Sequence, residues 1–363
     1  MINTEISKYL SKSFLISTLI TLSAFTSIIF IGDMVEYSKK LSSQENVNLG
    51  LLIQLCVLNL PKMLLEIMPF ASLFAGLLWT IKIRGFKELL IMRTTGISLF
   101  QICLPICAMA FLIGVVFILI FSPIISATQK KVQRIESDEL NKPLTSILVS
   151  NSGFWLKQGS RKGSDIIYAK KLDARNLSLF DVLVFRFNSN YEVQERITAK
   201  STELVEDYWL LKNLSFTNKL GETKYASQMM LPTNITNTQI KEGFSSPETI
   251  SFWNLVPFIR MFDKAGFSTK KHRIYFYKLI IFPLYLVGMA LLGVSFNIQN
   301  LSKRSSNLGI LFGTIMGFII FYLTKIIGAL AISGKIPLFL SSLIPTVIPL
   351  MLATSIILYV NEK

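Results

Sequence analysis

Charged residues are scarce in this sequence: they make up 16% of its 363 residues, against about 25% in a typical soluble domain. Hydrophobic residues make up 51%, so the composition excludes an ordinary soluble protein and favours a membrane protein. The three cysteines, Cys56, Cys103 and Cys107, all lie in apolar stretches, which excludes the disulfide framework of a small secreted protein. A single histidine leaves no cluster of residues typical of a metal site.

Motifs for nucleotide binding and hydrolysis are also missing. The pair Gly334-Lys335 is not part of a P-loop, because Ala329 stands where the first glycine is required. No G-x-S-x-G or H-E-x-x-H motif occurs, and His272, between two basic residues, is interpreted as a solvated residue at the membrane edge. We therefore expect the chain to be no enzyme and to bind no cofactor of its own.

Long charge-free runs give the layout of the membrane spans. A helix needs roughly 20 apolar residues to cross the hydrocarbon core, and five runs are long enough. They lie between Lys12 and Asp33, Arg93 and Lys130, Lys278 and Lys303, Arg304 and Lys325, and Lys335 and Glu362. A sixth run, between Glu66 and Lys82, reaches spanning length only if Lys62 and Glu66 lie within its helix. The sequence therefore predicts six transmembrane helices.

Basic residues set the predicted orientation, because Lys and Arg are enriched on the cytoplasmic side of membrane helices. With six spans, the basic clusters before span one, between spans two and three, between spans four and five and at the C-terminus all lie on one face. That face is predicted to be cytoplasmic, with both termini on it. The long segment after span three then lies on the outer side.

The outer segment has the pattern of an inserted β domain. Alternation over 182–187 places Leu183, Phe185 and Phe187 on one face, and further short runs rich in β-branched and aromatic residues are separated by turn formers. Residues 251–264 then show helical periodicity, with Gly266 as the expected C-cap. The predicted fold is three transmembrane helices (1–123), an all-β domain of sandwich or barrel type (124–250), an amphipathic helix and connection (251–274) and three further transmembrane helices (275–363).

The link between spans two and three, about 84–97, is predicted to contain a short amphipathic helix on the cytoplasmic face. It begins near Phe86 and ends before Gly96. Such a helix could dock into a groove of another protein, or it could lie on lipid head groups as an ordinary interfacial helix. The residues selected in this segment are Arg84, Glu88, Leu89, Met92, Arg93 and Gly96.

Lys62 and Glu66 are spaced i, i+4 in the second span. The simpler interpretation is a local ion pair that lowers the cost of burying both charges. The functional interpretation is a cationic spot that meets anionic lipid head groups near the outer leaflet. Lys39, Lys40 and Lys325 fall at a similar depth, although a lysine at a membrane edge often snorkels without binding a ligand. Together with Lys62 they form a predicted ring of positive charge.

Gly309, Gly313 and Gly317 repeat at four-residue spacing in the fifth span. Small residues at this spacing allow two helices to approach closely. The sequence leaves open whether the partner helix belongs to this chain or to a second subunit.

Several motifs, taken in order, resemble the LptF/LptG family of lipopolysaccharide export permeases. The strongest runs from Glu88 to Ser98 and includes Arg93 and Gly96. The others are Asp33-Met-Val-Glu36, Pro61-Lys62, Met68-Pro69-Phe-Ala-Ser-Leu-Phe-Ala75, Pro123 closing span three, Gly153-Phe-Trp155-Leu-Lys157, Tyr277-Lys278 with Pro283-Leu284, the glycine repeat and Gly334-Lys-Ile-Pro337. Gly153-Phe-Trp155, Pro61-Lys62 and the spacing from Lys278 to Pro283 are similar to the LptG branch.

The resemblance implies a permease subunit of an ABC transporter in the bacterial inner membrane, with a periplasmic, jelly-roll-like β domain. An LptF-like and an LptG-like subunit together enclose a cavity that takes up lipopolysaccharide. A dimeric, LptB-like ATPase that uses ATP and Mg²⁺ grips the segment between spans two and three. LptC-like and LptA-like periplasmic proteins receive the lipid, and nucleic acid is not among the partners.

The same resemblance assigns roles to residues. The segment 84–97 binds the ATPase, and Glu88 meets its basic residues. Phosphate contacts fall to Lys62, Lys39, Lys40 and Lys325, since an ammonium group binds phosphate as a point charge; Lys39 and Lys40 lie a few residues later than the family's basic pair. The lateral gate and cavity fall to Phe30, Ile31, Gly309, Gly313, Gly317 and Phe321, and a lipid groove in the β domain to Leu183, Phe185 and Phe187.

Three other functions are open at this level. The chain could take the LptF-type role in the same complex, or it could be a non-transporting scaffold whose β domain recruits periplasmic proteins. A secondary transporter is disfavoured, because Glu66 is the one carboxylate expected within a span and ion-coupled carriers normally need buried acidic groups.

Overall fold

The computed structural model divides the chain into two compact units. The helical unit comprises Met1–Val132 and Arg273–Lys363, and the β unit comprises Gln133–His272. The residues described are 4–41, 49–85, 87–139, 146–150, 153–160, 163–173, 178–188, 193–205, 208–218, 223–233, 246–264, 268–298 and 306–361.

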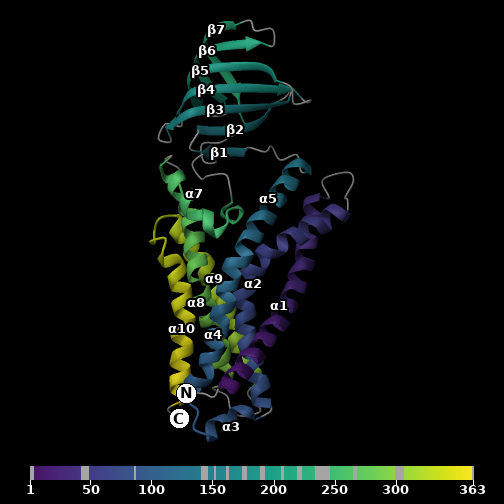
Figure 1. The fold of residues 1–363 in the computed structure, drawn as a ribbon, viewed down its shortest axis with the longest axis vertical. Coiled ribbons are helices and arrows are strands. Elements are labelled where there is room, and N and C mark those ends of the chain that lie inside the picture. The colour runs from purple at the N-terminus through teal and green to yellow at the C-terminus, as the bar shows by residue number, and fades with distance from the viewer. Residues whose placement is uncertain are drawn as a thin grey trace. The chain divides into compact units, whose positions relative to one another are not determined.

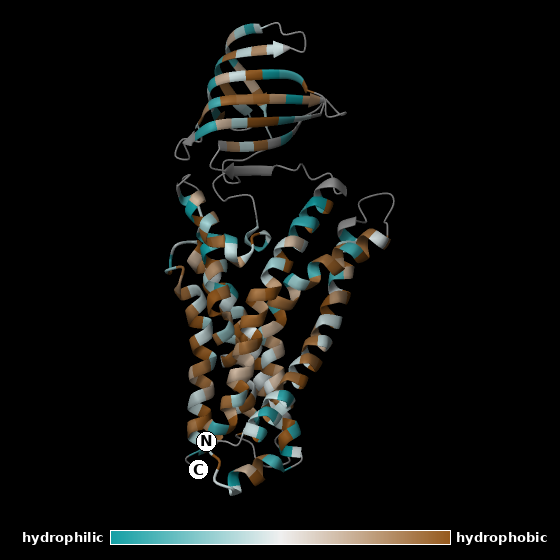
Figure 2. Cartoon of the chain, viewed as in Figure 1, coloured by the Kyte–Doolittle hydropathy of each residue, from teal (hydrophilic) through white to brown (hydrophobic). Residues whose placement is uncertain are grey.

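Among the described residues, six helices are long and apolar enough to cross a membrane, which confirms the predicted number of spans. Hydrophobic residues run along each of them (Figure 2). The start of the first helix, the end of the last and the short helix α3 lie at the same end of the helical unit (Figure 1). The helices are α1 (Thr4–Leu41), α2 (Leu49–Gly85), α3 (Glu88–Thr94), α4 (Leu99–Val116), the π-helix η1 (Phe117–Phe121), α5 (Ser122–Glu139), α8 (Lys270–Ile298), α9 (Ser306–Ile332) and α10 (Leu340–Asn361).

The sequence predicts that the third span ends at Pro123. In the structure it instead continues through η1 into α5 as far as Glu139. A proline inside an α-helix removes a backbone donor and clashes with the carbonyl four residues earlier. Here that carbonyl belongs to Leu119, within the π-helix. A π turn changes the hydrogen-bond spacing, so the helix passes the proline without ending.

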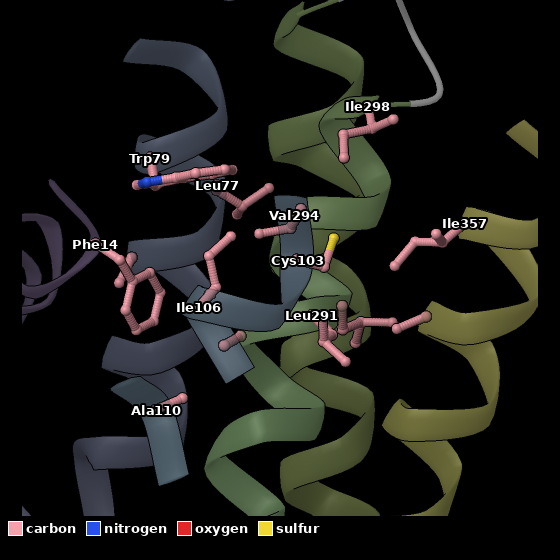
Figure 3. Packing of buried hydrophobic residues seen from close by; sticks show 14 of the residues in the cluster. Phe14, Leu77, Trp79, Cys103, Ile106, Ala110, Leu291, Val294, Ile298 and Ile357 are labelled. Carbon is pink, nitrogen blue, oxygen red and sulfur yellow. The ribbon is translucent and has the colours of Figure 1, made fainter. Parts of the chain in front are cut away.

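The core of the helical unit is formed where α1, α2, α4, α8 and α10 meet (Figure 3). Trp79 of α2 is fully buried, and its indole Nε1 donates a hydrogen bond of 3.3 Å to the carbonyl of Leu10 on α1. A buried indole N–H needs a partner, so this bond fixes the position of α1 against α2. With α1 held in this position, Tyr9 near its start lies next to α3.

Two glycines allow α2 and α8 to touch through their backbones. A Cβ added to Gly293 of α8 would overlap the carbonyl oxygen of Leu73, and one added to Gly76 of α2 would overlap that of Ala290. Neither overlap involves a side chain that could move aside. The α2–α8 contact therefore depends on small residues, as is common between membrane helices.

The substitution Gly293→Ala is expected to lower the stability of the detergent-solubilised chain by about 1–3 kcal/mol, the usual cost of overpacking. The matched control is Gly328→Ala on α9, where an added Cβ meets nothing within 4 Å and alanine is the better helix former. The thermal midpoint of unfolding measures both. A Gly293→Ala midpoint equal to that of the control would contradict the close α2–α8 contact.

The described part of the β unit forms a seven-stranded antiparallel sheet in the order β1 to β7, each strand pairing with its neighbours in sequence. The predicted fold class, six membrane helices with an inserted all-β domain, is confirmed, and the sheet is a meander. The strands are β1 (Ser146–Ser150), β2 (Gly153–Ser160), β3 (Gly163–Asp173), β4 (Ser178–Asn188), β5 (Val193–Val205), β6 (Tyr208–Asn218) and β7 (Thr223–Pro232).

One face of this sheet carries the core of the β unit, together with the helix α7 (Phe252–Lys264). Leu255, Ile259 and Phe262 of α7 are buried, which confirms the predicted amphipathic helix; Gly266, its predicted C-cap, lies outside the described residues. The short 3₁₀-helix η2 (Pro247–Thr249) precedes α7. His272 is 1% exposed and lies 5.0 Å from the ring of Phe258, so the prediction of a solvated histidine was wrong.

Candidate functional site

The segment between α2 and α4 forms the predicted short helix. α3 runs from Glu88 to Thr94, and Gly96 adopts a left-handed backbone conformation with φ of 85°, which glycine takes without steric cost. Ser98 then caps α4 through a capping box with Gln101. The helix therefore begins and ends as its sequence predicts, apart from Phe86, which lies outside the described residues.

Glu88 is held by a residue far away in the sequence. The hydroxyl of Tyr9, on α1, donates to both carboxylate oxygens of Glu88, at 2.9 and 3.1 Å. A carboxylate has about four acceptor sites, so Glu88 can still accept hydrogen bonds from another group. The contact joins α3 to the first membrane helix, which the sequence did not predict.

The apolar residues of α3 divide into an inner and an outer pair. Leu89 is 3% exposed and Met92 packs against the core of the helical unit. Leu90 and Ile91 are 61% and 59% exposed. The exposed apolar surface of α3 therefore consists of Leu90 and Ile91, whereas Leu89 and Met92, the two apolar residues predicted for this site, face inward.

The two predicted arginines of this segment have different environments. Arg84 lies at the end of α2, and its Nη1 donates a 2.9 Å hydrogen bond to the carbonyl of Asn297 near the end of α8. This bond satisfies a carbonyl in the last turn of a helix, where a cation is favourable. Arg93 is half-buried in the last turn of α3. Arg84 therefore braces α2 against α8.

The predicted cationic ring is only partly assembled. Lys62 is half-buried on α2, whereas Lys39 and Lys325 are exposed; the side chain of Lys40 lies outside the described set. The Nζ of Lys325 lies 3.8 Å from Glu66 Oε2 and 5.4 Å from the ring centre of Phe321. Among the described residues no ion pair joins Lys62 to Glu66. Glu66 is thus paired across helices with Lys325 of α9.

The glycine repeat of α9 faces helices of this chain. A Cβ on Gly313 would lie 3.1 Å from the side chain of Leu77, and one on Gly317 would lie 3.4 Å from that of Leu73, both on α2; one on Gly309 would overlap Asn297 of α8. The repeat therefore packs against α2 and α8 of this chain, and its assignment to the gate and cavity stays a prediction.

The opposite side of α9 is a continuous apolar surface with a shallow groove of about 410 Å³. On α1, Ile31 is 64% exposed and Phe30 is half-buried. Phe321 on α9 is also half-buried, so these three predicted gate residues are at least partly accessible. The groove residues are Ile315, Phe318, Ile319, Tyr322, Leu323 and Ile326.

A chain of polar side chains links three helices and was missed by the sequence analysis. Asn59 of α2 donates a 2.9 Å hydrogen bond to Asp33 Oδ2 of α1, and Gln129 of α5 donates a 3.1 Å bond to Asn59 Oδ1. All three side chains are 6% exposed. Asp33 ends the first charge-free run of the sequence, but it lies within α1 and is buried. Buried ionisable groups within membrane helices are costly and commonly functional.

The substitution Asn59→Leu is expected to lower stability by about 1–3 kcal/mol, because its hydrogen bonds to the Asp33 carboxyl group and to the Gln129 side chain are both lost. Gln54→Leu, an exposed position on the same helix, is the control. Thermal unfolding in detergent compares the two. Equal midpoints for both variants would show that the polar chain does not hold α1, α2 and α5 together.

The three residues predicted to line a lipid groove in the β unit do not lie on the expected inner face of the sheet. Leu183, Phe185 and Phe187 are half-buried and lie on the face opposite the core, which is built from Val182 and Val184. The alternation was identified correctly, but the inward face was assigned to the three larger residues. The guanidinium of Arg196 covers Phe185 at 5.9 Å from the ring centre.

The fold and these sites define a class: a polytopic membrane protein of six spans with an inserted antiparallel sheet. The chain belongs to the lipopolysaccharide export system permease LptF/LptG family, whose sequence profile matches residues 8–361. It is therefore a multi-pass protein of the inner membrane. The lipopolysaccharide export system permease protein LptG of Haemophilus influenzae is 22% identical over 354 residues, covering 96% of each chain. The LptG protein of Escherichia coli K12 is 20% identical over 345 residues, covering 93% of this chain and 94% of its own.

Proposed function

We propose that the chain is the LptG-type permease subunit of a transporter that extracts lipopolysaccharide from the outer leaflet of the inner membrane. The observation that carries the proposal is the family match over residues 8–361, and the relatives named LptG, aligned over at least 93% of this chain, support the LptG-type role. The chain itself performs no ATP hydrolysis, since its sequence has no P-loop.

The energy therefore comes from a partner, a dimeric LptB-like ATPase that uses ATP and Mg²⁺. The geometry of α3 supports this assignment: Leu90 and Ile91 offer an exposed apolar contact, and Glu88 offers a carboxylate beside it. Movement of α3 reaches α1 through the hydrogen bonds from Tyr9. In this arrangement both termini are cytoplasmic and the β unit is periplasmic.

The cargo enters between this chain and an LptF-like subunit, past the accessible residues of α1 and α9. Lys62 is the lysine best placed for a lipid phosphate, because it is half-buried and unpaired among the described residues. Lys39 and Lys325 are exposed and act as secondary contacts. LptC-like and LptA-like proteins receive the lipid beyond the β unit.

Depletion of the chain tests the proposal. In cells that carry one repressible copy, newly made lipopolysaccharide is expected to stay with the inner-membrane fraction after repression, and a plasmid copy of the wild-type chain is expected to restore its arrival at the outer membrane. Unchanged arrival at the outer membrane after depletion would overturn the proposed function.

A further inference from the structure

A line of irregular positions crosses the β sheet from β3 to β7. Where β4 pairs with β5, Val182 pairs with Ala199, and the next pair is Phe180 with Ser201. Where β5 pairs with β6, Ala199 pairs with Leu214, and the next pair is Ser201 with Lys212. The ladder therefore skips Asp181, Lys200 and Asn213. The same skip leaves out Lys170 on β3 and Ser227 on β7.

Two of the skipped residues have an unusual backbone conformation. Asp181 and Asn213 adopt φ of 54° and 53°, a left-handed conformation that is uncommon within strands, although Asp and Asn adopt it more readily than other non-glycine residues. At each of them, two successive residues of the strand point away from the core. On β4, Leu179 and Val182 both face the core with two residues between them, whereas strict alternation would leave only one residue between them. Non-glycine residues in this conformation are concentrated at functional sites.

An open hollow of about 850 Å³ lies over this line on the outer face of the sheet, which is the face opposite the core. Two lysines, two tyrosines, several other hydrogen-bonding groups and four apolar residues, of which Leu183 and Leu214 are the largest, line it. Tyr225 is 85% exposed, which is unusual for so large an aromatic side chain. Within the described strands, Lys170 and Lys200 form no ion pair with Asp181. The residues that matter most are Tyr168, Lys170, Asp181, Lys200, Asn213 and Tyr225.

The chemistry of this lining selects a ligand class. Two ammonium groups on strands separated by one intervening strand, about 10 Å apart at the backbone, match an anionic ligand with spaced charges. The Asp181 carboxylate, the Asn213 amide and the hydroxyls of Thr198 and Ser215 match a ligand rich in hydroxyl groups. The exposed ring of Tyr225 offers a flat apolar surface with a polar end, whereas the ring of Tyr168 packs against Trp155 at 4.5 Å between ring centres. An acyl chain would instead require a continuous apolar lining.

We propose that this hollow is a binding site for the phosphorylated saccharide part of the cargo, separate from any site for its acyl chains. The inference rests on the proposed function, because it takes the cargo to be a lipopolysaccharide. It assigns to the outer face of the β unit the task of holding the saccharide while the lipid is transferred.

The probe is deacylated lipopolysaccharide, a phosphorylated oligosaccharide, and its binding to the fluorescently labelled full-length chain in detergent is measured by thermophoresis. The double variant Lys170→Gln/Lys200→Gln is expected to weaken binding about tenfold or more, since charge-assisted contacts are lost. The control, Lys171→Gln/Lys224→Gln, removes the same charge from exposed positions of the same sheet outside the hollow. Tyr225→Ala is also expected to weaken binding, and phosphatase treatment of the probe is expected to abolish the difference between the two double variants.

Equal weakening by the two double variants would overturn the proposal, because only general charge attraction would remain. Absence of binding by the wild-type chain would overturn it as well. Depletion of the chain separates the two claims. If lipopolysaccharide is retained in the inner membrane on depletion but the hollow variants bind the probe normally, the hollow fails and the proposed function stands.

Discussion

Reversing the charge of Lys62 is expected to lower the rate of lipopolysaccharide export by about 10- to 100-fold. The variant Lys62→Glu removes a charge-assisted contact to phosphate, worth about 1.5–3 kcal/mol, and adds repulsion between two anions. Lys62→Arg keeps the charge and is expected to retain most of the activity. Export is measured as the arrival of pulse-labelled lipopolysaccharide at the outer membrane in cells that depend on the variant.

The control for this prediction is Lys335→Glu, an exposed lysine between α9 and α10 that the proposed topology places on the same side of the membrane. It changes the net charge equally and is expected to leave export unchanged. Lys325→Gln is expected to have a smaller effect than Lys62→Glu, because the Lys325 ammonium is partly neutralised by Glu66. Normal export by Lys62→Glu would remove Lys62 from the cargo site.

The exposed apolar pair of α3 is expected to carry most of the affinity for the ATPase. Leu90→Asp is expected to weaken binding of the ATPase about 100-fold, as is typical when a central apolar contact of an interface is lost and a charge is buried in its place. Co-purification of the ATPase with the tagged chain in mild detergent measures this loss. Glu88→Ala is expected to reduce co-purification as well, since it removes the acceptor for the partner's basic residues.

Two variants separate the interface from the link to α1. Thr94→Asp places a charge at another exposed position of α3 and is expected to leave the ATPase bound. Tyr9→Phe removes only the hydroxyl that donates to Glu88, so it is expected to retain the ATPase but to reduce export. Wild-type amounts of ATPase with Leu90→Asp would show that the pair is not the contact surface.

The membrane spans and α3 could be predicted because each depends on local sequence. The thickness of the hydrocarbon core sets the length of a charge-free run, and Gly96 and the Ser98–Gln101 capping box mark where the chain leaves one helix and begins the next. These signals do not require knowledge of which helices touch.

Contacts between distant residues could not be predicted in this way. Lys62 and Glu66 have the spacing of a helical ion pair, but a lysine that precedes its glutamate is in the less favourable order, and Glu66 instead pairs with Lys325. The partner of Glu88 lies 79 positions away in the sequence. The bonds from Asn59 to Asp33 and from Gln129 to Asn59 likewise exist only once three helices are packed.

The β unit shows a different limit. Period-two alternation identifies which residues share a face, but it does not say which face is buried, and three large apolar residues on β4 favoured the wrong one. The left-handed conformations of Asp181 and Asn213 then interrupt the alternation. Asp and Asn tolerate this conformation better than most residues, but nothing in a strand-like sequence marks where it occurs.

Reconstitution tests the central claim, that this chain helps to move lipopolysaccharide out of the membrane, most directly. The wild-type chain with its co-purified partners is placed in liposomes containing labelled lipopolysaccharide, and transfer of the label to a soluble periplasmic acceptor is followed after addition of ATP and Mg²⁺. We predict transfer that requires ATP and is reduced at least tenfold by Lys62→Glu. Transfer that proceeds equally without ATP, or equally from liposomes lacking this chain, would contradict the proposed function.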